Sequence, residues 1–151
     1  METTSNKNTA TLTHLSTLTQ YFIPFGNYIF PIIIWSTQRE KSEYVNVQGK
    51  QTINFQLSLF VYTMVLALIA IPSFFVSVLR NMPFETFING GDVMVRNLNL
   101  QNISGMVTVL VMAVLVFVAM KIAEFFLIIY AAVKTSNGEN FKYPLTIPFL
   151  K

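Results

Sequence analysis

Cysteine is absent from this chain of 151 residues, which has a single histidine, His14, and a single aspartate, Asp92. The lack of cysteine excludes disulfides, thiolate nucleophiles and cysteine-ligated metals. A catalytic or metal-binding histidine needs companion residues, and the sequence offers none close to His14. We therefore expect His14 to be an interfacial or helix-end residue. We also expect a non-enzymatic protein with no catalytic residues, no metal site and no cofactor.

Charged residues are scarce too, at 11% of the chain against about 25% in a typical soluble domain. The chain also lacks the basic run with interleaved aromatic residues that would indicate a nucleic-acid partner. Hydrophobic residues make up 53%, and uncharged stretches cover 53–79 and 107–120. Because about 20 apolar residues let a helix cross a bilayer, this composition predicts an all-α membrane protein surrounded by lipid.

The chain is predicted to have a disordered tail at 1–11 and a single helical membrane domain at 12–151. Three transmembrane helices are expected, at about 12–35, 53–79 and 106–133, with an inserted extramembrane loop at 80–102. Asn89-Gly90-Gly91 indicates a turn within that loop. Asn137-Gly138 is a typical helix terminator, and the tail at 137–151 is predicted to lie along the membrane surface.

The first membrane segment contains two prolines, which make a straight helix impossible. Pro24 removes the backbone hydrogen bond to the carbonyl of Gln20, and Pro31 removes the one to Asn27. In lipid, freed carbonyls must find partners in neighbouring helices, hydroxyls or water. We expect a kinked span that faces protein, and the alternative is a re-entrant pair that dips into the membrane and returns.

Orientation follows from the Lys and Arg residues of the short connections. With three spans, the first connection and the carboxyl tail share one side, and this side holds Arg39, Lys41, Lys50, Lys134, Lys142 and Lys151. The opposite side holds Lys7, Arg80 and Arg96. We predict a multi-pass protein of the inner (cytoplasmic) membrane with its carboxyl end in the cytoplasm and its amino end outside. A re-entrant first segment would move the amino end inside.

Lys121 and Glu124 are the charged residues of the third span, and their spacing of three places them on one helix face. Charges near mid-membrane cost a few kcal/mol when unpaired, so both should face protein or a wet cavity. One interpretation gives the pair a function, as a proton or ion relay or as a contact with a partner subunit. The interpretation that we favour is a structural pair whose two charges neutralise each other. Asn27 and Gln56 could line a path, but interhelical hydrogen bonds are commoner.

Three ordered segments of the chain resemble the signatures of a known family. The segments are His14-Leu15-Ser16 with Phe22 to Asn27 and Pro31 to Trp35, then Gly49-Lys50-Gln51 with Asn54-Phe55-Gln56, and finally Asn137-Gly138-Glu139 with Tyr143 to Ile147. The chain resembles a family of small bacterial membrane proteins of unknown function. That family is distantly similar to the twenty-kilodalton component of the chloroplast inner-envelope import translocon. The resemblance implies a helical membrane protein and no particular catalytic residues.

Two functions are compatible with these features. The first is a non-enzymatic integral membrane subunit that packs with itself or with a larger membrane complex, because the broken first segment, the charged pair and the inserted loop all need protein neighbours. The alternative is an oligomeric channel or translocation component for protein or small solutes. Three spans cannot enclose an aqueous path alone, so this alternative requires a homo-oligomer.

Overall fold

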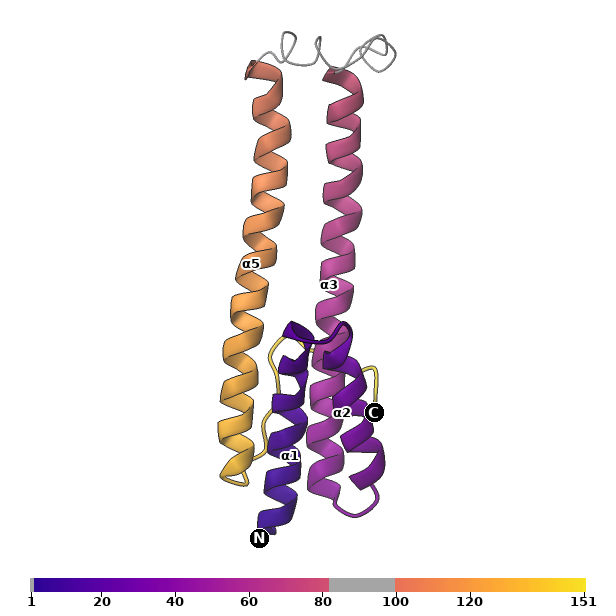
Figure 1. Ribbon diagram of the computed structural model, residues 1–151, viewed down its shortest axis with the longest axis vertical. Helices are drawn as coiled ribbons and strands as arrows, with labels where there is room; N and C mark the ends of the chain where they lie inside the picture. The colour runs from indigo at the N-terminus through magenta and orange to yellow at the C-terminus, as the bar shows by residue number, and fades with distance from the viewer. Residues whose placement is uncertain (1, 82–99) are drawn as a thin grey trace. The chain divides into compact units, whose positions relative to one another are not determined.

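The computed structural model describes the backbone of residues 2–81 and 100–151, and the side chains of residues 2–76 and 108–151. Over this part the chain contains α-helices and one short 3₁₀-helix, η1, and no strand, which confirms the all-α prediction. The elements are α1 (Thr4–Ser16), η1 (Thr17–Tyr21), α2 (Gly26–Gln38), α3 (Glu43–Asn81) and α5 (Leu100–Ser136) (Figure 1). The predicted turn at Asn89-Gly90-Gly91 and most of the loop at 80–102 lie outside the described residues.

Two helices of the described part are long and apolar enough to cross a membrane, over Glu43–Val76 and Thr108–Ser136. These segments contain most of the second and third predicted spans. At the start of α3, the Ser42 hydroxyl caps the helix by accepting a hydrogen bond from the backbone N–H of Val45 at 3.3 Å. α5 ends at Ser136, just before the predicted terminator Asn137-Gly138, where Gly138 adopts a positive φ of 81°.

The first predicted segment differs from the kinked span that we favoured. After α1 and η1 the chain reverses direction through residues 22–25, and α2 returns beside α1 (Figure 1). Phe25 makes the reversal possible with a left-handed backbone conformation, at φ 61°. Pro24 lies in this turn, so it ends a helix and does not kink one, whereas Pro31 is buried inside α2. The result is a helical hairpin with the geometry of the re-entrant alternative.

The predicted disordered tail is also helical, because α1 begins at Thr4. Thr3 caps this helix by accepting a hydrogen bond from the backbone N–H of Asn6 at 3.2 Å. The hydroxyls of the next threonines donate to carbonyls one turn earlier, as Thr9 does to Ser5 at 3.0 Å. The polar composition of this stretch therefore does not prevent a helix, since its hydroxyls bond within the helix and its far end is packed in the protein.

The described residues divide into two compact units, Met1–Val61 with Lys121–Lys151 and Tyr62–Met120. The first unit contains α1, η1, α2, the start of α3 and the end of α5, and its apolar core includes Phe55, Ile128, Ala131 and Tyr143. The second unit contains the remaining parts of α3 and α5. Most of its described large apolar side chains are exposed, as expected of helices that face lipid.

The carboxyl tail packs against α3, and its predicted position along the membrane surface stays a prediction. The ring of Tyr143 stacks on Phe55 of α3 with centroids 4.0 Å apart. Further along, the backbone N–H of Ile147 donates to the Ser58 hydroxyl at 2.8 Å, and that of Leu150 to the side-chain oxygen of Asn54 at 2.8 Å. Pro144 and Pro148 prevent a regular strand, so polar side chains of α3 satisfy the backbone of the tail in place of a sheet.

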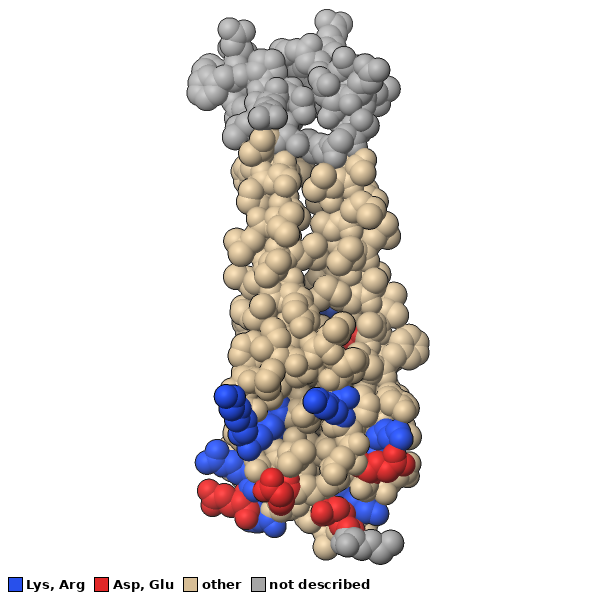
Figure 2. Space-filling model, turned by 180° about the vertical axis from the view of Figure 1, so that it is seen from behind, with Lys and Arg blue, Asp and Glu red and all other residues tan. Residues whose placement is uncertain are grey.

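Charged side chains gather at one end of the first unit, where α1 begins, α2 and α5 end and α3 begins (Figures 1 and 2). They include Arg39 and Glu40 after α2, Lys41 and Glu43 before α3, and Lys134 and Glu139 at the end of α5. Lys134 and Glu139 form an exposed ion pair. Such a charged end is typical of the side of a membrane protein that faces water.

Candidate functional site: the polar interior of the first unit

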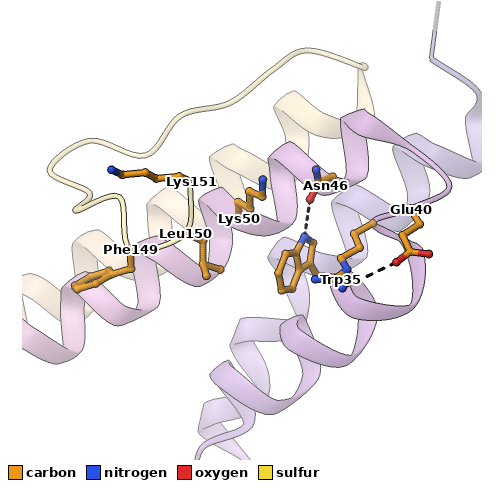
Figure 3. Close-up of a pocket in the computed structure, with 8 residues that line it drawn as sticks. Trp35, Glu40, Asn46, Lys50, Phe149, Leu150 and Lys151 are labelled. Atoms are coloured by element: carbon orange, nitrogen blue, oxygen red, sulfur yellow. Dashed lines mark hydrogen bonds and ion pairs between the residues drawn. The ribbon is translucent and has the colours of Figure 1, made fainter.

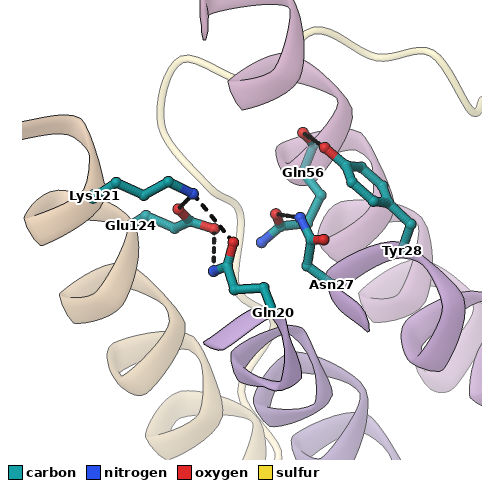
Figure 4. Close-up of polar contacts among 6 residues, drawn as sticks. All are labelled: Gln20, Asn27, Tyr28, Gln56, Lys121 and Glu124. Atoms are coloured by element: carbon teal, nitrogen blue, oxygen red, sulfur yellow. Dashed lines mark hydrogen bonds and ion pairs between the residues drawn. The ribbon is translucent and has the colours of Figure 1, made fainter. Parts of the chain in front are cut away.

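Lys121 and Glu124 lie in the first unit and form a closed hydrogen-bonded ring with Gln20 of η1 (Figure 4). The Lys121 ammonium donates to one carboxylate oxygen of Glu124 at 2.8 Å and to the side-chain oxygen of Gln20 at 3.1 Å. The Gln20 amide donates to the other carboxylate oxygen at 2.9 Å. Only 1% of the Glu124 side chain is exposed, against 39% of Lys121. Each oxygen of the buried carboxylate therefore has its own donor.

Asn27 and Gln56 form the interhelical hydrogen bond that their polarity suggested. The Asn27 amide of α2 donates to the side-chain oxygen of Gln56 of α3 at 2.8 Å, and the Tyr28 hydroxyl donates to the Gln56 carbonyl at 3.4 Å (Figure 4). Both amide side chains are buried. The amide nitrogen of Gln56 has no hydrogen-bond partner among the described residues. This bond ties α2, the returning arm of the hairpin, to α3.

His14 lies at the centre of a second polar network, and it is fully buried instead of interfacial. Its Nδ1 lies 2.9 Å from the Tyr143 hydroxyl and 2.8 Å from the Thr52 hydroxyl. Its Nε2 lies 3.2 Å from the side-chain amide of Gln48. The four side chains come from α1, α3 and the carboxyl tail, so the network joins three parts of the chain that are distant in sequence. His14 does lie in the last turn of α1, as the helix-end prediction had it, but its side chain is buried in the protein and not at an interface.

Burial controls the protonation of this network. It lowers the pKa of His14 from 6.5 to about 4, although the hydrogen bond with Gln48 acts in the opposite direction. Burial also raises the pKa of Tyr143. Histidine and tyrosine are therefore both neutral at physiological pH, and they act as hydrogen-bonding groups of the interior.

The three sequence segments that carry the family resemblance meet in this unit. His14 contacts Tyr143, Asn27 contacts Gln56, and the indole of Trp35 donates to the Asn46 side chain at 3.1 Å. Gly49 permits the close approach of Trp35, since a Cβ at this position would lie 2.4 Å from the Trp35 ring. These motif residues therefore hold the hairpin, α3 and the tail together.

Some residues of this polar interior could be predicted from the sequence. It identified Lys121, Glu124, Asn27 and Gln56, which the structure places in two hydrogen-bonded groups, and it identified the two prolines, which shape the hairpin. It gave no role to Thr52, because a threonine in an apolar run has no distinguishing pattern. A possible contact of any of these residues with a partner subunit stays a prediction.

In the described part of the chain, no three His, Cys, Asp or Glu side chains come together in a group that could hold a metal ion.

Comparison with known proteins identifies a family for this chain. A model described as the magnetosome magnetite crystal formation protein family matches residues 5–150. No curated protein and no solved structure matches the chain. The match supports a small bacterial membrane protein, while the resemblance to the chloroplast translocon component stays a prediction. With a match over nearly its whole length, this chain belongs to the magnetosome magnetite crystal formation protein family.

Proposed function

We propose that this protein is a non-enzymatic subunit of a magnetosome membrane and supports the formation of magnetite crystals there. The observation that carries the proposal is the family match, which covers residues 5–150 and so includes both candidate membrane spans and the whole polar interior. The family description supplies the role in crystal formation. The hydrogen bonds around Glu124 are the reason to propose a structural subunit.

The ring around Glu124 supports a structural role over a relay. Both carboxylate oxygens accept hydrogen bonds from the ring itself, one from Lys121 and one from Gln20. Transfer of a proton or ion through this group would require these bonds to break in a buried place, where an unpaired charge is costly. The ring instead fixes η1 against α5, as expected of a group that holds the hairpin in place.

We also propose that the hairpin of α1 and α2 enters the membrane and returns. Its turn exposes large aromatic side chains, with Phe22 87% and Phe25 70% exposed, and these suit contact with lipid. The returning arm, α2, has 13 residues and is therefore about 20 Å long, which is less than the roughly 30 Å of the hydrocarbon core. An arm of this length can lie within the bilayer but cannot cross it.

A re-entrant hairpin strengthens the charge asymmetry of the protein. Both ends of the chain and the connection between α2 and α3 then share one side of the inner membrane. The Lys and Arg residues of this side are Lys7, Arg39, Lys41, Lys50, Lys134, Lys142 and Lys151. Arg80 and Arg96 are left for the other side. Since basic connections tend to stay in the cytoplasm, we propose that both ends lie there, which is the orientation that the re-entrant alternative predicts.

A membrane-protein partner or a second copy of the chain is part of the same proposal. Lys121 lies in a candidate membrane span, and 39% of its side chain is exposed. An ammonium group open to lipid is costly, so a neighbouring protein that covers this edge of α5 would stabilise it. Purification in mild detergent tests this point, and a lone monomer that co-purifies with no other protein would contradict it.

The function is tested in a bacterium that encodes this chain and forms magnetite. Deletion of the gene should alter the size or number of the crystals while the membrane compartments remain, and the wild-type gene should restore them. Glu139→Gln, which changes an exposed ion pair, should restore them as well, whereas Glu124→Ala should not. Unchanged crystals in the deletion strain, or loss of the compartments themselves, would contradict a role in crystal formation. Electron microscopy measures both outcomes.

A further inference from the structure

A hollow of about 470 Å³ lies at the charged end of the first unit (Figure 3). It is bordered by the end of α2, the start of α3 and the last residues of the tail. We call it the cationic hollow, and it is lined by Trp35, Arg39, Glu40, Asn46, Lys50, Phe149, Leu150 and Lys151. All of these residues belong to one compact unit, so its walls are fixed relative to one another.

The charges of the cationic hollow favour an anion. Three of its residues are cationic, and Glu40 is its one acidic side chain. Glu40 neutralises little, because its contact with Arg39 is long, at 4.0 Å, and both side chains are largely exposed. Lys50 has no acceptor among the described residues. This half-buried residue lines the hollow, so its ammonium group is available for an external partner.

The apolar part of the lining favours a ligand that has an apolar portion beside its negative charge. The Arg39 guanidinium lies 5.2 Å from the centre of the Trp35 ring, so a flat aromatic surface adjoins the positive charge. Phe149, which is 46% exposed, borders the same space. Tryptophan residues concentrate where a membrane meets water, and Trp35 stands where the apolar run of α2 gives way to Arg39 and Glu40.

We propose that the cationic hollow binds the phosphate-bearing headgroup of an anionic phospholipid. The Arg39 and Lys50 side chains contact the phosphate, and Trp35 and Phe149 contact the glycerol and the first part of the acyl chains. Arginine and lysine both bind phosphate, and the aromatic wall distinguishes a lipid from free phosphate. Such a site would anchor α2, the start of α3 and the tail to the same membrane surface.

Trp35 is the only tryptophan of the chain, so its fluorescence reports on this hollow directly. The purified full-length protein is placed in phosphatidylcholine vesicles that contain equal small amounts of either brominated phosphatidylglycerol or brominated phosphatidylcholine. Bromine quenches tryptophan only on close approach. A basic residue near an anionic lipid surface raises affinity about fivefold, so Arg39 and Lys50 together should give roughly a twentyfold preference for phosphatidylglycerol.

Matched variants separate this site from general surface charge. Arg39→Gln with Lys50→Gln should lose the preference, whereas Lys41→Gln with Lys142→Gln, which removes the same charge outside the lining, should keep it. If the first pair does not fold, Lys50→Gln alone should lower the preference about fivefold. Equal quenching by the two lipids in the wild type, or an equal loss in both double variants, would overturn the proposal. Displacement of the quenching lipid by millimolar inorganic phosphate would also overturn it, because the hollow would then be a site for free anions.

Discussion

Replacement of Glu124 by alanine is expected to lower the free energy of unfolding by about 3 kcal/mol or more. The carboxylate is 1% exposed and accepts hydrogen bonds from both Lys121 and Gln20. Its removal leaves the Gln20 amide without its acceptor and the Lys121 ammonium without a counter-ion, with only the Gln20 oxygen to accept from it. Breaking a buried pair in this way is far more costly than breaking a surface pair. Denaturation of the purified protein in detergent micelles measures the loss.

The chain offers a matched control for this prediction. Glu139 also pairs with a lysine of α5, Lys134, but its side chain is 51% exposed. Glu139→Gln should therefore cost less than about 1 kcal/mol. Replacing both members of the buried pair, with Lys121→Met and Glu124→Leu, should restore much of the stability, because no unpaired charge remains. Similar losses for Glu124→Ala and Glu139→Gln would show that the ring does not hold the first unit together.

Acidification should destabilise the protein through His14. Burial lowers the pKa of this residue in the folded state to about 4, whereas the unfolded chain has the usual value of 6.5. The unfolded state therefore binds a proton first as the pH falls. The contribution of neutral His14 is fully present above pH 6.5 and is lost between pH 6.5 and about 4. By linkage, the total loss over this window is about 3 kcal/mol.

The variant His14→Gln separates this effect from the protonation of carboxylates. It cannot titrate, so its stability should change little as the pH falls from above 6.5, while the wild type weakens steadily. The carboxylates are the same in both proteins, so the difference between the two curves isolates His14. Unfolding midpoints measured across this pH range provide both curves. Parallel curves would contradict the buried, neutral state of the histidine.

The helical class and the two long spans could be predicted from the sequence, because the bilayer imposes a simple rule of length and composition. The end of α5 was also predicted from a local signal, the Asn137-Gly138 pair that follows it. The same rules do not distinguish a hairpin from a kinked span in the first segment. Pro24 is compatible with both a kink and a turn, and the choice depends on Phe25, whose left-handed conformation no local pattern indicates.

The interior was less predictable than the helices. Lys121 and Glu124 are conspicuous because charges are rare in apolar helices, but their partner Gln20 comes from η1, 104 residues before Glu124 in the sequence. His14 appeared to lack companions because Thr52 and Tyr143 are far away in sequence. Contacts of this kind are set by tertiary packing, and a single sequence gives no pattern from which to find them.

The hairpin of α1 and α2, in the first quarter of the chain, is proposed to enter the membrane and return, which leaves both ends on the cytoplasmic side. The absence of cysteine makes a direct measurement possible, because each introduced cysteine is the only thiol in the protein. Ser5→Cys, Asn89→Cys and Lys142→Cys are each expressed in the inner membrane and treated with a membrane-impermeant maleimide. Ser5→Cys and Lys142→Cys should react in inverted membrane vesicles and not in intact cells, and Asn89→Cys should show the reverse. Reaction of Ser5→Cys and Lys142→Cys from opposite sides would contradict the account and restore a first segment that crosses the bilayer.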